Sequence, residues 1–120
     1  MKSVQEINSL IFGANGTDAY HKFSPFPWYP VITDGVLAVA DAAACFWFLD
    51  IIGSYQTNKK LDPNFQVWKL TVDTEKKTAV AEGCNDTKVV VKQRIGYTDF
   101  PLEELKLFLI DGIILLPSEY

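Results

Sequence analysis

One segment of the chain, residues 35–52, constrains the fold more than any other. Its eighteen residues are nearly all apolar, and its only charges are Asp41 and Asp50. Such a length could cross a bilayer as one helix, but each aspartate would cost roughly 3 kcal/mol in a membrane, and alanine fills the segment in place of leucine. We therefore expect no membrane span. The pattern predicts one long helix, from Gly35 to about Tyr55, buried at the centre of a small domain.

The polar residues of this segment have expected roles. Thr33 or Asp34 is a suitable N-cap, and Asp34 and Asp41 share one helical face, with Asp50 on the opposite one. We expect Asp41 to be a buried, hydrogen-bonded carboxylate. Asp50 lies among large apolar side chains, where an unpaired charge is costly, so it should find a donor. The candidate donors are Lys22, Lys69, Arg94 and a tyrosine hydroxyl.

A shorter helix is predicted at the N-terminus, over residues 4–12. Ser3 and Glu6 fit a capping box, and apolar residues then recur at helical spacing. Residues 13–17 are rich in glycine and should end the helix. Residues 18–30 follow as a connecting stretch, in which Pro25, Pro27 and Pro30 forbid both helix and sheet pairing and favour an extended backbone.

Beyond residue 64 the apolar period changes from 3.6 to 2, which predicts strands. Trp68, Leu70 and Val72 should share one face. We expect five strands, over residues 66–72, 78–81, 88–95, 105–110 and 113–116, with turns at residues 74–77, 83–86 and 111–112. The prediction is a single α+β domain over residues 1–120, with the short N-terminal helix and the long buried helix packed on an antiparallel meander sheet of four to five strands.

Composition excludes several classes of function. The net charge of −4 argues against nucleic-acid binding. With one histidine, His21, and two cysteines, Cys45 and Cys84, the chain has no metal-binding pattern, and no cofactor fingerprint is present. Because the N-terminus lacks the apolar core of a signal peptide, we expect a cytoplasmic protein.

Six strings occur in an order that resembles a known set of proteins. They are GTDAYHK (16–22), TDGV (33–36), WFLD (47–50), FQVWKL (65–70), YTDFP (97–101) and LPSE (116–119). As a set they resemble a family of small bacterial and phage proteins of unknown function, from about residue 17 to the C-terminus. The resemblance implies no reaction; it implies that such chains occur on phages and other mobile elements as well as in chromosomes.

Catalysis has weak support in the sequence. The best constellation takes Cys84 or Ser24 as nucleophile, His21 as base, and Asp34, Asp50 or Asp99 as the residue that orients the base. No glycine-flanked nucleophile or phosphate loop accompanies it. We therefore expect a protein that is not an enzyme, with a hydrolase using His21 as the least favoured alternative.

Binding is better supported, by aromatic residues on the proline-rich stretch. Such side chains lose little entropy on contact and suit a protein surface or a flat ligand, although they could also plug one end of the core. The leading hypothesis is an acidic binding protein from a phage or mobile element that inhibits a host or defence protein. The alternative is a protein that binds a nucleotide-like signal, with aromatics on the base and Lys22, Lys92 or Arg94 on phosphate. The candidate binding residues are His21, Lys22, Phe26, Trp28, Tyr29, Asp50, Arg94 and Asp99.

A homodimer is also conceivable, through an exposed strand edge. Residues 88–95 and 105–110 are both apolar enough to pair with a second chain, and the sequence does not choose between them.

Overall fold

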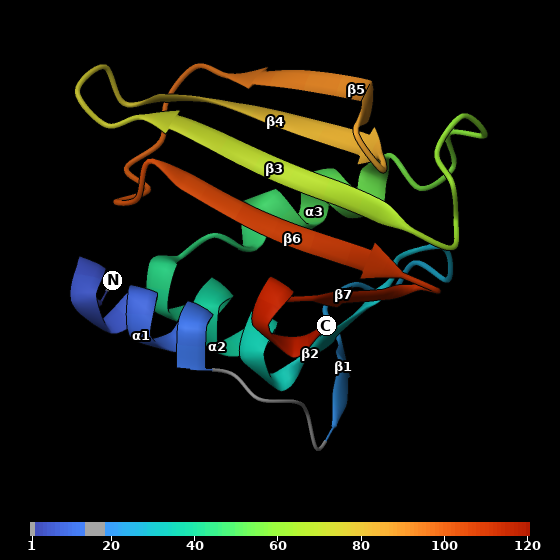
Figure 1. Ribbon diagram of the computed structural model, residues 1–120, viewed down its shortest axis with the longest axis horizontal. Helices are drawn as coiled ribbons and strands as arrows, with labels where there is room; N and C mark the ends of the chain where they lie inside the picture. The colour runs from blue at the N-terminus through green and yellow to red at the C-terminus, as the bar shows by residue number, and fades with distance from the viewer. Residues whose placement is uncertain (1, 14–18) are drawn as a thin grey trace.

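The computed structural model describes residues 2–13 and 19–120. Within these ranges the chain forms three α-helices, seven strands and a 3₁₀ helix (Figure 1). In chain order they are α1 (Val4–Gly13), β1 (Tyr20–Lys22), β2 (Val31–Thr33), α2 (Asp34–Ala43), α3 (Phe46–Ser54), β3 (Gln66–Asp73), β4 (Thr78–Asn85), β5 (Lys88–Ile95), β6 (Glu104–Ile110), β7 (Ile113–Leu115) and η1 (Pro117–Glu119).

The α+β class is confirmed, but the sheet is larger than expected. It has seven strands in the order β1-β2-β7-β6-β3-β4-β5, and it is mixed, because β2 pairs in parallel with β7. The two strands that the sequence missed, β1 and β2, flank the proline-rich loop. Their residues are free of proline, so the restriction that the prolines impose applies only to the loop between them.

The sheet is not a meander. β6 pairs with β3, so residues 96–103 must cross from one edge of the β3–β4–β5 unit to the other. Two backbone hydrogen bonds guide this crossing, from Thr98 N to Lys77 O (2.8 Å) and from Val72 N to Glu103 O (2.8 Å). β6 is therefore internal, and of the two expected dimerisation edges only residues 88–95 form an edge strand.

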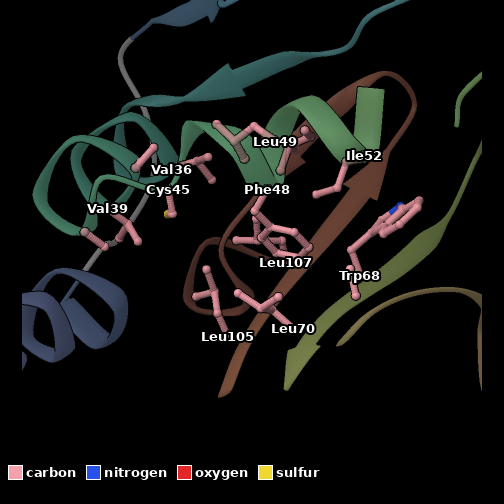
Figure 2. Packing of buried hydrophobic residues seen from close by; sticks show 14 of the residues in the cluster. Val36, Val39, Cys45, Phe48, Leu49, Ile52, Trp68, Leu70, Leu105 and Leu107 are labelled. Atoms are coloured by element: carbon pink, nitrogen blue, oxygen red, sulfur yellow. The ribbon is translucent and has the colours of Figure 1, made fainter. Parts of the chain in front are cut away.

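The inner face of the sheet packs against the helices, as expected from the alternation in β3. Trp68, Leu70 and Val72 are buried there beside Leu105 and Leu107 of β6. Figure 2 shows Phe48 and Ile52 of α3 directed into this layer, and Leu49 of the same helix is also buried. One side of the sheet is thus covered and the other is left to solvent.

The expected long helix is two helices, because the chain breaks at Ala44. Ala44 takes a left-handed conformation (φ 52°, ψ 45°), and Cys45 N donates to Ala40 O (3.0 Å), which is the pattern of a Schellman C-cap. The break lets α2 pack against β1, β2 and β7, whereas the α3 end contacts Trp68 through Tyr55. Two short helices can follow a twisted sheet that one straight helix cannot.

The N-cap of the segment is Thr33, whose Oγ1 accepts from Val36 N (3.2 Å). The expectation of buried acids is wrong, because both Asp41 and Asp50 are exposed. In α2 the buried side is formed by Val36, Val39, Ala40 and their neighbours, and Asp41 lies outside it.

Two local predictions at the ends of α1 and β4 had mixed outcomes. At α1, Ser3 Oγ accepts from Glu6 N (3.2 Å), which confirms the N-cap, but the Glu6 carboxylate accepts from the Ser3 hydroxyl (3.1 Å) in place of the Ser3 backbone amide that a capping box predicts. The predicted helix over residues 4–12 agrees with Val4–Gly13, and residues 14–17 of the stretch expected to end it lie outside the described residues. The turn expected at residues 83–86 is wrong, since β4 continues to Asn85. Gly83 is required inside the strand because an added Cβ would lie 2.6 Å from the Trp68 ring.

The Asp111-Gly112 hairpin is confirmed. Both residues have positive φ, 50° and 83°, as a tight turn between β6 and β7 requires. Among the described residues, no helix is long and apolar enough to span a membrane.

Replacing Ala44 by glycine should stabilise the protein. Glycine removes the steric cost of the left-handed conformation, and after its greater freedom in the unfolded chain is subtracted we expect a gain of about 1 kcal/mol in the free energy of unfolding. Ala38→Gly, in the middle of α2, should instead cost about 1 kcal/mol. Urea unfolding measures both; equal destabilisation by the two variants would contradict the break at Ala44.

Candidate functional site

Four aromatic side chains between β1 and β2 form one aromatic cluster: Phe23, Phe26, Trp28 and Tyr29. Phe26 and Trp28 are stacked, with ring centroids 4.8 Å apart, and Tyr29 lies 5.6 Å from Phe23 and 5.5 Å from Phe26. A turn holds them, with Tyr29 N donating to Phe26 O (3.2 Å) and Phe26 N to Ser24 Oγ (3.3 Å). The prolines restrict the backbone between these contacts.

Tyr29 anchors the cluster to α3. Its ring lies on Gly53, where an added Cβ would be only 2.5 Å from the ring, so no larger residue fits without displacing Tyr29. Its hydroxyl donates to the Asp50 carboxylate (2.8 Å). Asp50 therefore finds a tyrosine donor, as one of the alternatives predicted, although it does so at the surface.

The outer part of the cluster is open to solvent. Phe26 is 49% exposed and Trp28 is 48% exposed, while they stack on each other. A cleft of about 490 Å³ lies beside Trp28 and is lined also by Pro63, Asn64 and Asp111. The sequence expectation that these aromatics could simply plug the core does not fit Phe26 and Trp28, which are half outside it.

A second cleft, of about 560 Å³, lies between α3 and β5. It brings together three of the predicted residues, Asp50, Arg94 and Asp99, with Trp47 and Tyr97. Asp50 lines this cleft and accepts from Tyr29 of the aromatic cluster, so the two features meet at α3.

His21 and Lys22 do not join these features through any contact in the described part of the chain. His21 Nε2 lies 2.6 Å from Asp34 Oδ1, at the beginning of α2, and Asp34 Oδ2 accepts from Ala19 N (3.3 Å). Lys22 is exposed on β1. The binding role predicted for these two residues is therefore separate from the aromatic cluster.

The catalytic constellation finds its base and an orienting acid in His21 and Asp34, but its two candidate nucleophiles have other surroundings. Ser24 Oγ accepts from Phe26 N (3.3 Å) in the aromatic loop. Cys84 lies on β4, five strand positions from His21 on β1, or about 24 Å at the usual strand spacing. Burial, with a smaller contribution from the charge of Glu82, raises the pKa of the Cys84 thiol, and burial raises that of Cys45 to about 12. Both thiols are thus poor nucleophiles at neutral pH.

Two features of the structure were not foreseen. On the outer face of the sheet, Phe65, Phe108 and Tyr120 form a second group of rings with centroids 5.5 to 6.2 Å apart. At the start of α2, Glu119 accepts from Thr33 Oγ1 (2.7 Å) and ties the C-terminal η1 to the helix. The alternation of apolar residues in β6 could have assigned Phe108 to the outer face, but no local signal indicates the Glu119 contact.

The chain belongs to a family of unknown function, DUF6876. The model of this family matches residues 5–120, which is nearly the whole chain and includes every residue of the aromatic cluster and of the α3–β5 cleft. Comparisons with curated proteins and with solved structures gave no match. Membership thus confirms the family resemblance seen in the sequence, and the family's description assigns no reaction or ligand.

The contact between Tyr29 and Asp50 has a titration signature. Burial, and then the hydrogen bond and negative charge of Asp50, raise the pKa of the Tyr29 hydroxyl above its ordinary value of 10.0. Since the folded protein holds this proton more tightly than the unfolded chain, the stabilisation is fully present below pH 10 and is lost as the pH rises through the folded-state pKa.

Asp50→Asn should therefore lower the pKa of Tyr29 toward 10.0, because the variant removes the negative charge. Ultraviolet absorbance of tyrosinate during an alkaline titration measures the change, and Tyr29→Phe identifies which part of the signal belongs to Tyr29. Superimposable titrations of the native protein and Asp50→Asn would contradict the contact.

Proposed function

We propose that this protein is a non-catalytic binding protein and that the aromatic cluster is its contact with a protein partner. The observation that carries the proposal is the stack of Phe26 on Trp28, which is half exposed and yet held by the turn, the prolines and Tyr29. An aromatic side chain that becomes fully buried removes about 150–250 Å² of surface from water. A side chain that is already ordered loses little entropy when a partner covers it. Tryptophan and tyrosine are also the residues that most often dominate binding energy in protein interfaces.

The charge around the cluster favours a basic site on the partner. The Asp50 carboxylate accepts a hydrogen bond from Tyr29, and Asp111 lines the cleft beside Trp28. The chain as a whole has a net charge of −4. Complementary charge speeds the encounter and selects among partners more than it adds affinity. A rigid acidic domain with an aromatic contact is suited to covering a basic functional surface of another protein.

The proposed partner class is a host or defence protein, which the bound protein would inhibit in the cytoplasm, with the gene carried by a phage or mobile element. Small size, negative charge and the occurrence that the family resemblance implies support this proposal. The inhibition follows from occupancy alone, because a basic site covered by the aromatic cluster is closed to its own ligand.

A nucleotide-like ligand is the second candidate, supported by the aromatic residues Trp47 and Tyr97 that line the α3–β5 cleft. Arg94 adjoins the cleft through β5, but the strand register places its side chain on the opposite, outer face. Two carboxylates, Asp50 and Asp99, line the same cleft and would repel a phosphate. Protein binding through the aromatic cluster is the better-supported function.

The double variant Phe26→Ala/Trp28→Ala should fold and lose its partner. Both side chains are half exposed, so the melting temperature should change little, whereas loss of two central aromatics should weaken binding about 30-fold or more. Affinity capture from host lysate with quantitative mass spectrometry measures the retained proteins. Phe12→Ala, which removes an aromatic side chain that is 77% exposed on α1, is the matched control.

The proposal requires a protein that the native chain and Phe12→Ala capture and the double variant does not. Identical sets of captured proteins from all three would overturn it.

A further inference from the structure

The edge strand β5 (Lys88–Ile95) is a second surface that can accept a partner. Within residues 2–13 and 19–120, β5 pairs with β4 alone; it has eight residues, and proline is absent from it. The opposite edge strand, β1, has three residues. A long edge strand presents unpaired backbone N–H and C=O groups that can pair with another extended chain unless something blocks them. β5 shares no residue with the aromatic cluster, and its pairing edge does not depend on that cluster.

The two faces of β5 differ in character. Gly83 and Ala81 of β4 are buried on the helix side, and they stand opposite Val91 and Gln93, which assigns those β5 residues to the inner face. Lys92 and Arg94 alternate with them, so their side chains lie on the outer face, and both residues are exposed. Neither forms an ion pair within the part of the chain that the structure describes.

The α3–β5 cleft lies on the inner side of this edge. Gln93 and Ile95 form one wall, and Trp47 and Ile51 of α3 form the other. A strand added to β5 would lie about 4.8 Å beyond it, with every second side chain on the inner face beside Gln93 and Ile95. The apolar part of these walls, formed by Trp47, Ile51 and Ile95, favours apolar side chains at those inner positions, and the carboxylates of Asp50 and Asp99 in the same cleft disfavour acidic ones there.

The outer charges decide which kind of strand fits. β5 could pair antiparallel with β5 of a second copy. If the pairing were centred on Lys92, Lys92 would stand opposite Lys92 of the other copy. If it were centred on Gln93, Lys92 would stand opposite Arg94. Like charges directly opposite destabilise a strand pair, so self-pairing is disfavoured. Acidic side chains at the outer positions of the added strand would instead meet both cations.

We propose that β5 is a strand-addition site for an extended segment of a partner protein in which acidic residues alternate with apolar ones. Backbone hydrogen bonds to β5 supply the attachment, Lys92 and Arg94 pair with the acidic side chains, and the α3–β5 cleft takes the apolar ones.

Short capped peptides test this inference with the full chain. The probe is a peptide of alternating glutamate and valine, compared with one of alternating lysine and valine, and amide chemical shifts of the protein follow the titration. The glutamate peptide should shift the amides of β5 and of the facing side of α3. The lysine peptide should bind at least about tenfold more weakly, because its charges oppose Lys92 and Arg94.

Charge-reversal variants complete the test. Lys92→Glu/Arg94→Glu should weaken the glutamate peptide about tenfold and strengthen the lysine peptide. Lys106→Glu, at an exposed cation on the internal strand β6, should leave both affinities unchanged, as should Phe26→Ala/Trp28→Ala. The inference is overturned if millimolar glutamate peptide shifts no β5 amide, if the two peptides bind alike, or if Lys106→Glu has the effect of the double reversal.

Discussion

The position of Trp68 between the sheet and α3 is the constraint on which the rest of the structure depends. Its indole is 1% exposed, lies over Gly83 of β4, and packs 6.0 Å from the Tyr55 ring at the end of α3. Its Nε1 donates to Gln66 Oε1 (2.8 Å), so the buried polar atom is satisfied. These contacts set the height and direction of α3 over the sheet. α3 in turn holds Gly53 and Asp50 under Tyr29, and the exposed aromatic cluster is thereby built on the centre of the core.

The second constraint is that the described helices cover one side of the sheet and leave parts of it open. α2 covers the side of β1, β2 and β7, and α3 covers the middle, so β5 lies at the rim of the helical layer. Tyr55 at the end of α3 donates to Gln93 of β5 (3.0 Å), and a cleft remains between β5 and the preceding part of α3. The crossing of residues 96–103 removes β6 from the edge and leaves β5 there. The aromatic cluster and the β5 edge are thus both consequences of the helices covering only part of the sheet. Both are suited to contacts with another protein.

Local signals in the sequence predicted much of the fold. The change of apolar period located five of the strands, the Asp111-Gly112 pair fixed one hairpin, and Thr33 marked the start of α2. Non-local pairings were out of reach. Nothing near residues 20–22 or 31–33 indicates that they join the sheet, and the parallel pairing of β2 with β7 brings together residues about eighty positions apart. The break at Ala44 was missed because alanine favours helix, and tertiary packing overrides that preference here.

The candidate site was predicted only in part, because local signals were again readable and non-local contacts were not. The prolines indicated a loop that carries the aromatics, although residues 26–29 form a hydrogen-bonded turn where an extended backbone was expected. Asp50 was expected to find a donor, which is Tyr29. The predicted surroundings of Asp50 were wrong. Its apolar neighbours in sequence lie on the buried side of α3, whereas Asp50 lies on the exposed side. Which carboxylate meets His21, and that Asp50, Arg94 and Asp99 share a cleft, depend on the order of strands, which the sequence alone does not reveal.

Amide hydrogen exchange along β5 tests most directly the central claim, that this chain keeps surfaces open for a partner. If β5 is a free edge, amides that donate to β4 should be protected and the alternate amides, which point to solvent, should exchange rapidly, apart from the irregularity near Gly83 and Cys84. That alternation between slow and fast exchange over residues 88–95 is the result we expect. Uniform protection of the strand would show that its edge is already covered in the isolated protein and would contradict the account.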